Sequence, residues 1–363
     1  MFPSYGTDIA LMEKHVFGTN AKTVSKGDSM RPSELKALIA ARFKAKIKRP
    51  LHVESSPGLG KTQIAAQVAT ELGIEFKAIH APLLQPEDYG FPVIAQDKST
   101  VHFVVSQAKF PIVGSPCSDS GIFLIDEMGQ ADSSAQKILA NLIQEREIHG
   151  IPLKPEWLVL TTGNRVTDRA GSNRLLSHLK NRLTAIELEA SLDDWTQWAI
   201  GHGIKPEVIA FIRFRPELLN AFDPQNDINA TPRSWSEGVS PALGVIDPAL
   251  EFPVFRGDVG EGAAAEFCAF LKIFRKLPSP DAILMSPKTA EVPTDPATVY
   301  AICGALAHRA TDVNFGRIME YIKRLPPEFS VLFVRDAIQR QPSIKTSSDF
   351  IAWASGDGAK LLT

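Results

Sequence analysis

The segment Ser55-Ser56-Pro57-Gly58-Leu59-Gly60-Lys61-Thr62 constrains the fold of this chain more than any other, because it joins a short apolar run to a helical pattern. A glycine-containing loop that opens a helix presents converging backbone N–H groups, which suit a chain of phosphates. Lys61 is then expected to reach the β- and γ-phosphates, and the Thr62 hydroxyl to ligate Mg²⁺. The usual pattern starts with glycine, and Ser55 can replace it if its φ is negative. The alternative interpretation is an ordinary strand-to-helix turn.

A second motif ends another predicted strand with two carboxylates. The apolar residues Ile122–Ile125 are followed directly by Asp126 and Glu127. Asp126 is expected to hold Mg²⁺, through water, because this ion keeps much of its hydration shell. Glu127 is the candidate base that orients or deprotonates an attacking water. The alternative is an acidic pair that only favours the start of a helix.

A polar residue also follows the apolar strand that begins near Trp157. Asn164 stands after Thr162-Gly163 at the tip of this strand. If the strand lies beside the acidic one, the Asn164 side chain can sense the γ-phosphate and help to position water. The alternative is that Asn164 is only a turn residue, a position that asparagine favours. The spacing alone leaves both interpretations open.

Short strands alternate with helical patterns in the first half of the chain. This alternation predicts an α/β fold with a parallel sheet flanked by helices. The expected strands are 51–54, 76–79, 122–125, 158–161 and 183–188, and the expected helices include 32–48 and 61–72. Beyond about residue 190 the periodicity becomes helical, apart from a proline-containing loop expected at 223–258.

The composition limits the partners and the compartment. A formal net charge of −2 over 363 residues gives no general electrostatic attraction to nucleic acid or to an anionic membrane. A basic strip at Arg42–Arg49 is more simply a solvated helix face than a nucleic-acid patch. Three widely spaced cysteines form no metal or disulfide pattern. With no apolar signal or membrane-spanning run in the sequence, we expect a cytoplasmic protein.

The order of these motifs resembles the AAA+ ATPases, and within them the MoxR and dynein-related branch that includes midasin-like and CbbQ/NorQ-like proteins. Residues 55–62 resemble Walker A, 122–127 Walker B and 160–164 sensor 1. The stretch 176–183 is similar to the arginine-finger segment, Thr231-Pro232-Arg233 to sensor 2, and Pro86–Gly90 to a segment that precedes an inserted hairpin. The resemblance covers roughly residues 35–240, and it departs at Ser55 and at Leu183, where phenylalanine is usual.

The resemblance implies roles for two arginines. Arg182 would act in trans on the γ-phosphate bound by a neighbouring subunit, and Arg233 would contact the nucleotide in cis. A guanidinium near a transferring phosphoryl group stabilises its charge. Arg169 and Arg174 are rival candidates for the finger, and an ordinary surface arginine is the alternative for both positions.

The resemblance also implies an organisation and a function. It predicts a lead-in at 1–34, an AAA+ nucleotide-binding domain at 35–190, a helical lid at 191–260 and a helical region at 261–363. With ATP and Mg²⁺ as cofactors, the chain would form a ring, most often a hexamer, that remodels a client protein complex. A von Willebrand-type protein often takes part in such systems. The hairpin near Phe91–Phe110 and the loop Glu147–Pro155 are candidate pore or substrate elements.

Two other functions stay open. A nucleic-acid motor resembling the GTP-using McrB proteins would suit Thr162–Arg165 and Asp168-Arg169, although the neutral charge disfavours it. A nucleotide-switched scaffold with negligible turnover is the other, and the presence of Glu127 disfavours it. The sequence does not decide between ATP and GTP.

Overall fold

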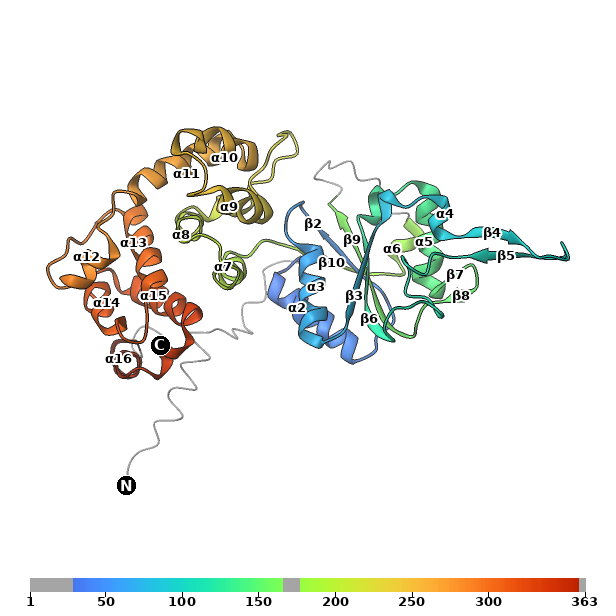
Figure 1. Cartoon of the computed structure of the whole chain (residues 1–363), viewed down its shortest axis with the longest axis horizontal. Helices are drawn as coiled ribbons and strands as arrows, with labels where there is room; N and C mark the ends of the chain where they lie inside the picture. Colours follow the sequence, from blue (N-terminus) through green and yellow to red (C-terminus); the bar gives the residue numbers. More distant parts are fainter. Residues whose placement is uncertain (1–28, 166–176, 359–363) are drawn as a thin grey trace, which may run out of the picture. The chain divides into compact units, whose positions relative to one another are not determined.

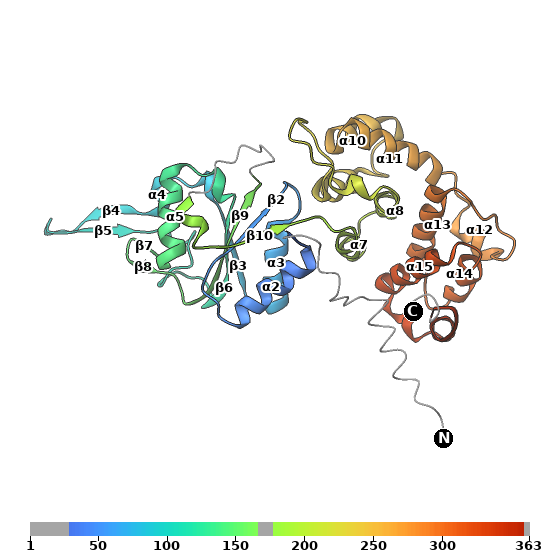
Figure 2. The same cartoon turned by 180° about the vertical axis from the view of Figure 1, so that it is seen from behind.

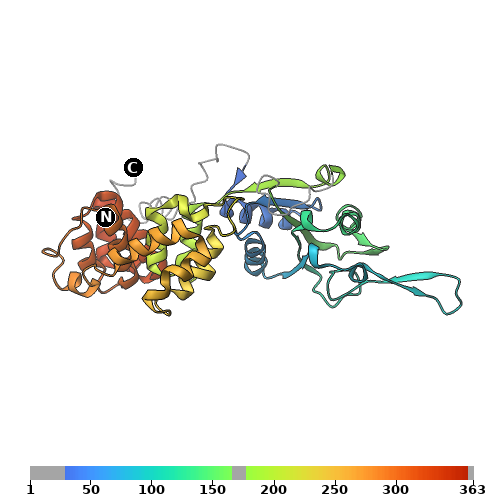
Figure 3. The ribbon, with the colours of Figure 1, turned by 90° about the horizontal axis from the view of Figure 1, so that it is seen from above.

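The computed structural model describes residues 29–165 and 177–358. The chain divides into two compact units, and each is described by itself. The first comprises Ser25–Ser191 with Phe222–Asp227, and the second Leu192–Ala221 with Ile228–Thr363. The first is built on a sheet, and the described part of the second contains helices and no strand (Figures 1 and 3).

The sheet of the first unit has six strands in the order β1-β10-β2-β9-β6-β3, and all neighbouring strands are parallel. Their bounds are β1 Ser29–Met30, β10 Thr184–Leu188, β2 Leu51–Ser55, β9 Glu156–Asn164, β6 Ser120–Asp126 and β3 Glu75–His80. The carboxyl ends of all six strands therefore meet at one edge. The chain leaves β2 for the far strand β3 and later returns to β10 on the other side of β2, which makes the end of β2 a switch point where ligands bind.

Helices cover both faces of the sheet because the strands alternate their apolar side chains. In β6, Ile122 and Leu124 belong to the cluster that holds α2 (Pro32–Lys44) and α3 (Lys61–Leu72). Phe123 and Ile125 belong to the opposite cluster, with α5 (Ser133–Glu145) and Leu179 of α6 (Ser177–Lys180). Figures 1 and 2 show α2 and α3 side by side. The predicted fold class, a parallel sheet flanked by helices and followed by a mostly helical region, is confirmed.

The predicted bounds of individual helices differ in accuracy. The helix expected at 61–72 is α3, closed by Gly73 with a φ of 66°. The helix expected to reach Lys48 ends at Lys44, so this boundary was wrong. Lys46 has a φ of 53°, and this left-handed conformation is incompatible with a continuing α-helix.

Two hairpins extend the first unit. The helix α4 (Pro86–Tyr89) leads into β4 (Phe91–Ile94), which pairs antiparallel with β5 (Val101–Val104) and projects beyond the sheet (Figures 1 and 3). This hairpin was predicted. The loop predicted at Glu147–Pro155 is instead a second hairpin of β7 (Glu147–Ile148) and β8 (Ile151–Pro152). Its turn uses left-handed backbone at His149 and Gly150, a turn type that joins antiparallel strands.

The second unit is an assembly of helices around aromatic side chains such as Phe211, Trp235 and Phe267. The longer helices are α7 Leu192–Gly201, α8 Pro206–Phe214, α10 Glu251–Val259, α11 Glu261–Phe274, α13 Pro296–Arg309, α14 Phe315–Ile322 and α15 Pro327–Arg340, and shorter ones are α9 Ser240–Ala242, α12 Pro280–Met285 and α16 Ser348–Trp353. Within the described residues, no helix is long and apolar enough to cross a membrane.

The loop predicted at 223–258 was wrong over much of its length. A π-helical turn at Ser234–Val239 continues into α9, and α10 follows. The prolines of this stretch do not prevent helices because of where they stand. Pro253, for example, is the third residue of α10, where a backbone N–H has no partner within the helix in any case.

Candidate nucleotide-binding site

The loop between β2 and α3 turns through two glycines with left-handed backbone. Gly58 has a φ of 80° and Gly60 a φ of 78°, values that favour glycine over any other residue. Gly60 is the N-cap of α3, so the loop ends at a helix N-terminus with its free N–H groups. Ser55, which stands where glycine is usual, is buried and keeps a negative φ. The departure from the usual pattern therefore leaves the backbone of the loop unstrained.

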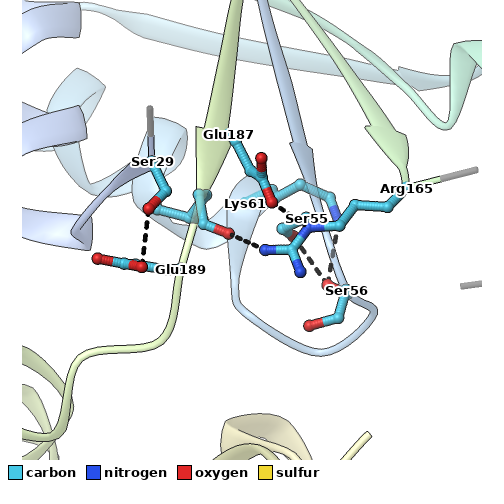
Figure 4. Close-up of polar contacts among 8 residues, drawn as sticks. Ser29, Ser55, Ser56, Lys61, Arg165, Glu187 and Glu189 are labelled. Atoms are coloured by element: carbon cyan, nitrogen blue, oxygen red, sulfur yellow. Dashed lines mark hydrogen bonds and ion pairs between the residues drawn. The ribbon is translucent and has the colours of Figure 1, made fainter. Parts of the chain in front are cut away.

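The side chain of Lys61 lies across the start of this loop. Its Nζ donates to Ser55 Oγ at 2.8 Å and approaches the Ser56 carbonyl oxygen at 3.4 Å (Figure 4). It also donates to Asn164 Oδ1 at 3.1 Å. Asn164 ends β9, and the strand register pairs it with Ser55. The structure thus brings together Lys61 and Asn164, which the sequence places 103 positions apart.

A second chain of hydrogen bonds links the predicted metal-binding residues. Thr62 Oγ1 donates to Asp126 Oδ2 at 2.8 Å. Thr162 Oγ1 donates to the other oxygen, Asp126 Oδ1, and accepts from the backbone N–H of Glu127 at 3.0 Å. A hydroxyl beside a carboxylate is an oxygen-only donor set, which fits Mg²⁺. Across the described residues no group of three or more His, Cys, Asp or Glu side chains forms a metal site. A bound Mg²⁺ would therefore depend on Thr62, Asp126, water and the nucleotide.

Glu127 is held in an unusual backbone conformation at the end of β6. Its φ of 54° and ψ of 40° are left-handed, which is uncommon for a residue with a side chain. Its carboxylate is one-third exposed, and Oε2 lies 3.9 Å from Nδ1 of His80. His80 ends β3 directly beside Asp126 in the register of the sheet. His80 was not among the predicted site residues, because only the pairing of β3 with β6 reveals that it lies beside the acidic pair.

The strands β2 and β9 are joined beneath the site by a buried histidine. His52 Nδ1 lies 2.7 Å from Thr161 Oγ1, and Nε2 lies 3.2 Å from Glu54 Oε1. The hydrogen bond with His52 is the main cause that lowers the pKa of Glu54. A Cβ on Gly163 would lie 3.2 Å from the His52 ring. Close packing against His52 therefore favours glycine directly before Asn164.

Arg165 crosses the end of β2 and ties together the strands on either side. Its backbone N–H donates to the Ser55 carbonyl at 3.3 Å, and its Nε lies 2.7 Å from Glu187 Oε1 of β10 (Figure 4). Its Nη2 also donates to the Leu188 carbonyl at 3.2 Å. Arg165 was noted in the sequence only as part of a motif, and its partners on β10 follow from the strand order.

The structure does not bring Arg182 to this edge of the sheet. Arg182 is exposed in the turn between α6 and β10, two residues before Thr184, which pairs with Leu51 at the start of β2. The phosphate loop follows the other end of β2, and a strand of five residues spans about 15 Å. Arg182 therefore lies at the amino edge of the sheet, opposite the loop of its own chain.

Arg233 belongs to the second unit, where it precedes the π-helical turn and is not in the predicted loop. Its side chain is 54% exposed, and its Nε lies 3.9 Å from Glu237 Oε2. Its predicted contact with nucleotide stays a prediction. The rival candidates Arg169 and Arg174 lie outside the described residues.

Residues 53–185 match the family model of the ATPase family associated with various cellular activities (AAA). This segment is similar to AAA ATPase domains. The match runs from β2 into β10 and includes Lys61, Asp126, Glu127, Asn164 and Arg182. The AAA domain and the parallel sheet agree with the predicted superfamily, whereas the MoxR branch stays a prediction.

Comparison with solved structures gives remote similarities. NtrX from Brucella abortus is 14% identical with a TM-score of 0.38, over 91% of this chain and 71% of that one. A RuvB variant from Thermotoga maritima is 16% identical with a TM-score of 0.37, over 76% of this chain and 81% of that one. No match was found among curated proteins. Similarity at this level gives no information about substrate or partner.

Proposed function

We propose that this chain is a Mg²⁺-dependent ATPase whose subunits complete one another's active sites. The observation that supports it is the convergence of Lys61, Asn164, Thr62 and Asp126 at the carboxyl edge of the sheet. Lys61 and the loop N–H groups would bind the β- and γ-phosphates, and Thr62 and Asp126 would hold Mg²⁺. Bound Mg²⁺ would neutralise charge that develops on the phosphates.

Water activation would depend on Glu127 and Asn164. The Glu127 carboxylate can accept a proton from an attacking water, and the backbone N–H of Glu127 is fixed by Thr162. The Asn164 amide, already bonded to Lys61, can orient the same water or the γ-phosphate. These groups come from the neighbouring strands β6 and β9 and from the loop after β2, so the rigid sheet sets their spacing.

The position of Arg182 supports assembly. An arginine at the amino edge cannot reach the loop at the carboxyl edge of its own sheet, but it can reach the loop of a neighbour. A head-to-tail interface that uses two different surfaces closes into a ring when the rotation between subunits divides a full turn, and we propose a hexamer. Arg233 of the helical unit would contact nucleotide in cis as part of a lid formed by residues 191–260.

The ring would remodel a client protein complex, as MoxR-like proteins do, together with a von Willebrand-type protein. The β4–β5 hairpin supports contact with a polypeptide, because it projects from the AAA domain and exposes apolar side chains. Those side chains are Phe91, Val93, Ile94, Val101, Phe103 and Val104, each at least 41% exposed.

A nucleic-acid motor is the weaker candidate. Most of the basic strip is engaged within the chain: Arg42 contacts the Arg49 carbonyl, Lys46 pairs with Glu156 at 3.1 Å, and Lys48 contacts the Pro155 carbonyl. The ion pair of Lys46 offsets one positive charge, and the two carbonyl contacts hold the donors of Arg42 and Lys48 against the protein, so fewer cations of the strip are available to phosphate backbones.

The test mixes two inactive variants. Glu127→Gln removes the base and Arg182→Ala removes the finger, and each alone should be nearly inactive. In mixed rings, some interfaces join an intact Glu127 with an intact Arg182 of the neighbour, so ATP hydrolysis should return. If Arg182 acts in cis, every mixed site lacks one group and no activity returns. Subunit exchange is first verified with two differently tagged chains.

The client is sought with the same trapped state. Glu127→Gln rings in ATP should retain bound client, whereas Lys61→Ala chains, which cannot bind nucleotide, serve as the matched control. A protein recovered only with Glu127→Gln supports a client. Recovery of nucleic acid in its place would support the motor.

A further inference from the structure

The turn that carries Arg182 is held by another arginine. Arg49 Nη2 donates to the carbonyl oxygen of Asn181 at 2.8 Å and to that of Leu183 at 3.0 Å. These two carbonyls flank Arg182 on either side. The guanidinium of Arg49 therefore clamps the backbone of one residue before and one residue after Arg182.

The clamp is connected to the strand that carries the phosphate loop. Arg49 and Pro50 directly precede β2, and the Pro50 carbonyl accepts from the Thr184 N–H at 2.9 Å. The carbonyl of Arg49 itself accepts a hydrogen bond from the buried Arg42 of α2. Residues 49–50 thus fix the turn 181–183 between a helix and the start of β2, with contacts from both main chain and side chain.

We propose that Arg49 is a positioning residue: it fixes the backbone around Arg182 and so orients the Arg182 side chain toward a neighbouring subunit. This rests on the proposed trans role of Arg182. Within the described residues, the Arg49 guanidinium donates to backbone oxygens of the turn, so its effect on hydrolysis passes through Arg182. A guanidinium is suited to this role because each terminal nitrogen carries two N–H groups in a fixed plane, and here Nη2 donates to both carbonyls.

The clamp is not a general support of the fold. Arg49 is exposed, so its truncation leaves no cavity and no buried unpaired charge. The turn keeps its own hydrogen bonds, from Arg182 N to the Leu179 carbonyl at 2.9 Å and from Thr184 N to Pro50. A variant without the clamp should fold, with the turn in place but less precisely directed.

The test compares Arg49→Ala with Lys46→Ala. Lys46 is a matched control because it is an exposed cation at the same edge of the sheet and pairs with Glu156 rather than with the turn. Arg49→Ala should lower kcat about tenfold and leave the KM for ATP within about twofold, because an ångström of misplacement is enough for such a loss. Lys46→Ala should keep wild-type values. If Arg49→Ala does not fold, Arg49→Lys, which keeps a cationic donor but not the planar group, is measured for the same change in kcat without a change in KM.

Two further measurements test whether Arg49 acts through Arg182. Arg49→Ala mixed with Glu127→Gln should regain activity, as Arg182→Ala does, because the defect lies in the neighbour's site. Arg49→Ala added to Arg182→Ala should cause no further loss. Wild-type turnover in Arg49→Ala, a raised KM, or an additive loss in the double variant overturns the inference. If mixing Arg182→Ala with Glu127→Gln restores no ATP hydrolysis, the trans role of Arg182 is wrong, and so is the inference about Arg49. If mixing restores hydrolysis for Arg182→Ala but not for Arg49→Ala, only the inference about Arg49 is wrong.

Discussion

Asn164 Oδ1 accepts a hydrogen bond from Lys61 Nζ at 3.1 Å, so the tip of β9 is bonded to the cation of the phosphate loop. The amide oxygen is neutral and can release the lysine when the negatively charged triphosphate of a nucleotide offers a stronger partner. Because of this contact, the charge of the side chain at position 164 should determine how tightly the nucleotide binds.

Asn164→Asp should therefore weaken ATP binding, because a carboxylate would hold Lys61 in an ion pair that competes with the phosphates. We expect a rise in Kd of about tenfold or more, measured by calorimetry. Asn164→Ala is the control: it removes one neutral acceptor of Lys61 and adds no charge, so it should keep the affinity while turnover falls. Equal affinities in the two variants would contradict this account of Lys61.

Substitutions of Lys61 and Glu127 should have different effects on ATP binding and on ATP hydrolysis. Lys61→Ala removes a phosphate contact made in the ground state, so ATP binding and hydrolysis should both be lost. Glu127→Gln keeps the backbone and the shape and removes only the base, so binding should persist while turnover falls by at least about a hundredfold. Hydrolysis at the wild-type rate in Glu127→Gln would falsify the assignment of the base.

His80 should influence Glu127 without binding nucleotide. Its ring lies 3.9 Å from the carboxylate, so it can restrict where that carboxylate points. His80→Ala should change kcat several-fold with little effect on the KM for ATP. The same substitution combined with Glu127→Gln should have almost no further effect. A raised KM in His80→Ala would mean that the histidine contacts substrate.

The left-handed backbone of Glu127 should reduce stability. Glycine adopts this conformation without strain, so Glu127→Gly should raise the free energy of unfolding relative to Glu127→Ala by about 1 kcal/mol. Both variants lack the carboxylate and should be inactive. Chemical denaturation of the two proteins side by side measures the difference. An alanine variant as stable as the glycine variant would show that the conformation relaxes.

The sequence predicted those features that local chemistry determines. Gly58, Gly60 and Gly73 mark a loop and a helix end because their backbone conformations are costly for other residues, and the structure agrees at all three. The apolar run before Asp126 likewise identified a buried strand. The prolines near residue 253 were less informative, since their effect depends on the exact position within a helix turn.

The rest depends on contacts between distant segments. His80 faces Glu127 only because β3 pairs with β6, and Arg49 meets the turn 181–183 only because β10 pairs with β2. A lone histidine or a basic strip carries no local signal of such a partner. The position of Arg182 at the edge opposite its own phosphate loop also follows only from the parallel pairing of β10 with β2.

The position of Arg182 has a consequence for how the activity depends on assembly of the chain. If each Arg182 serves the next subunit, an open row always ends with one nucleotide site that lacks an arginine and one arginine that serves no site. Only closure of the row removes both defects at once. Specific activity should then rise as subunits assemble and fall on dilution, although every isolated chain contains all the groups that the reaction needs.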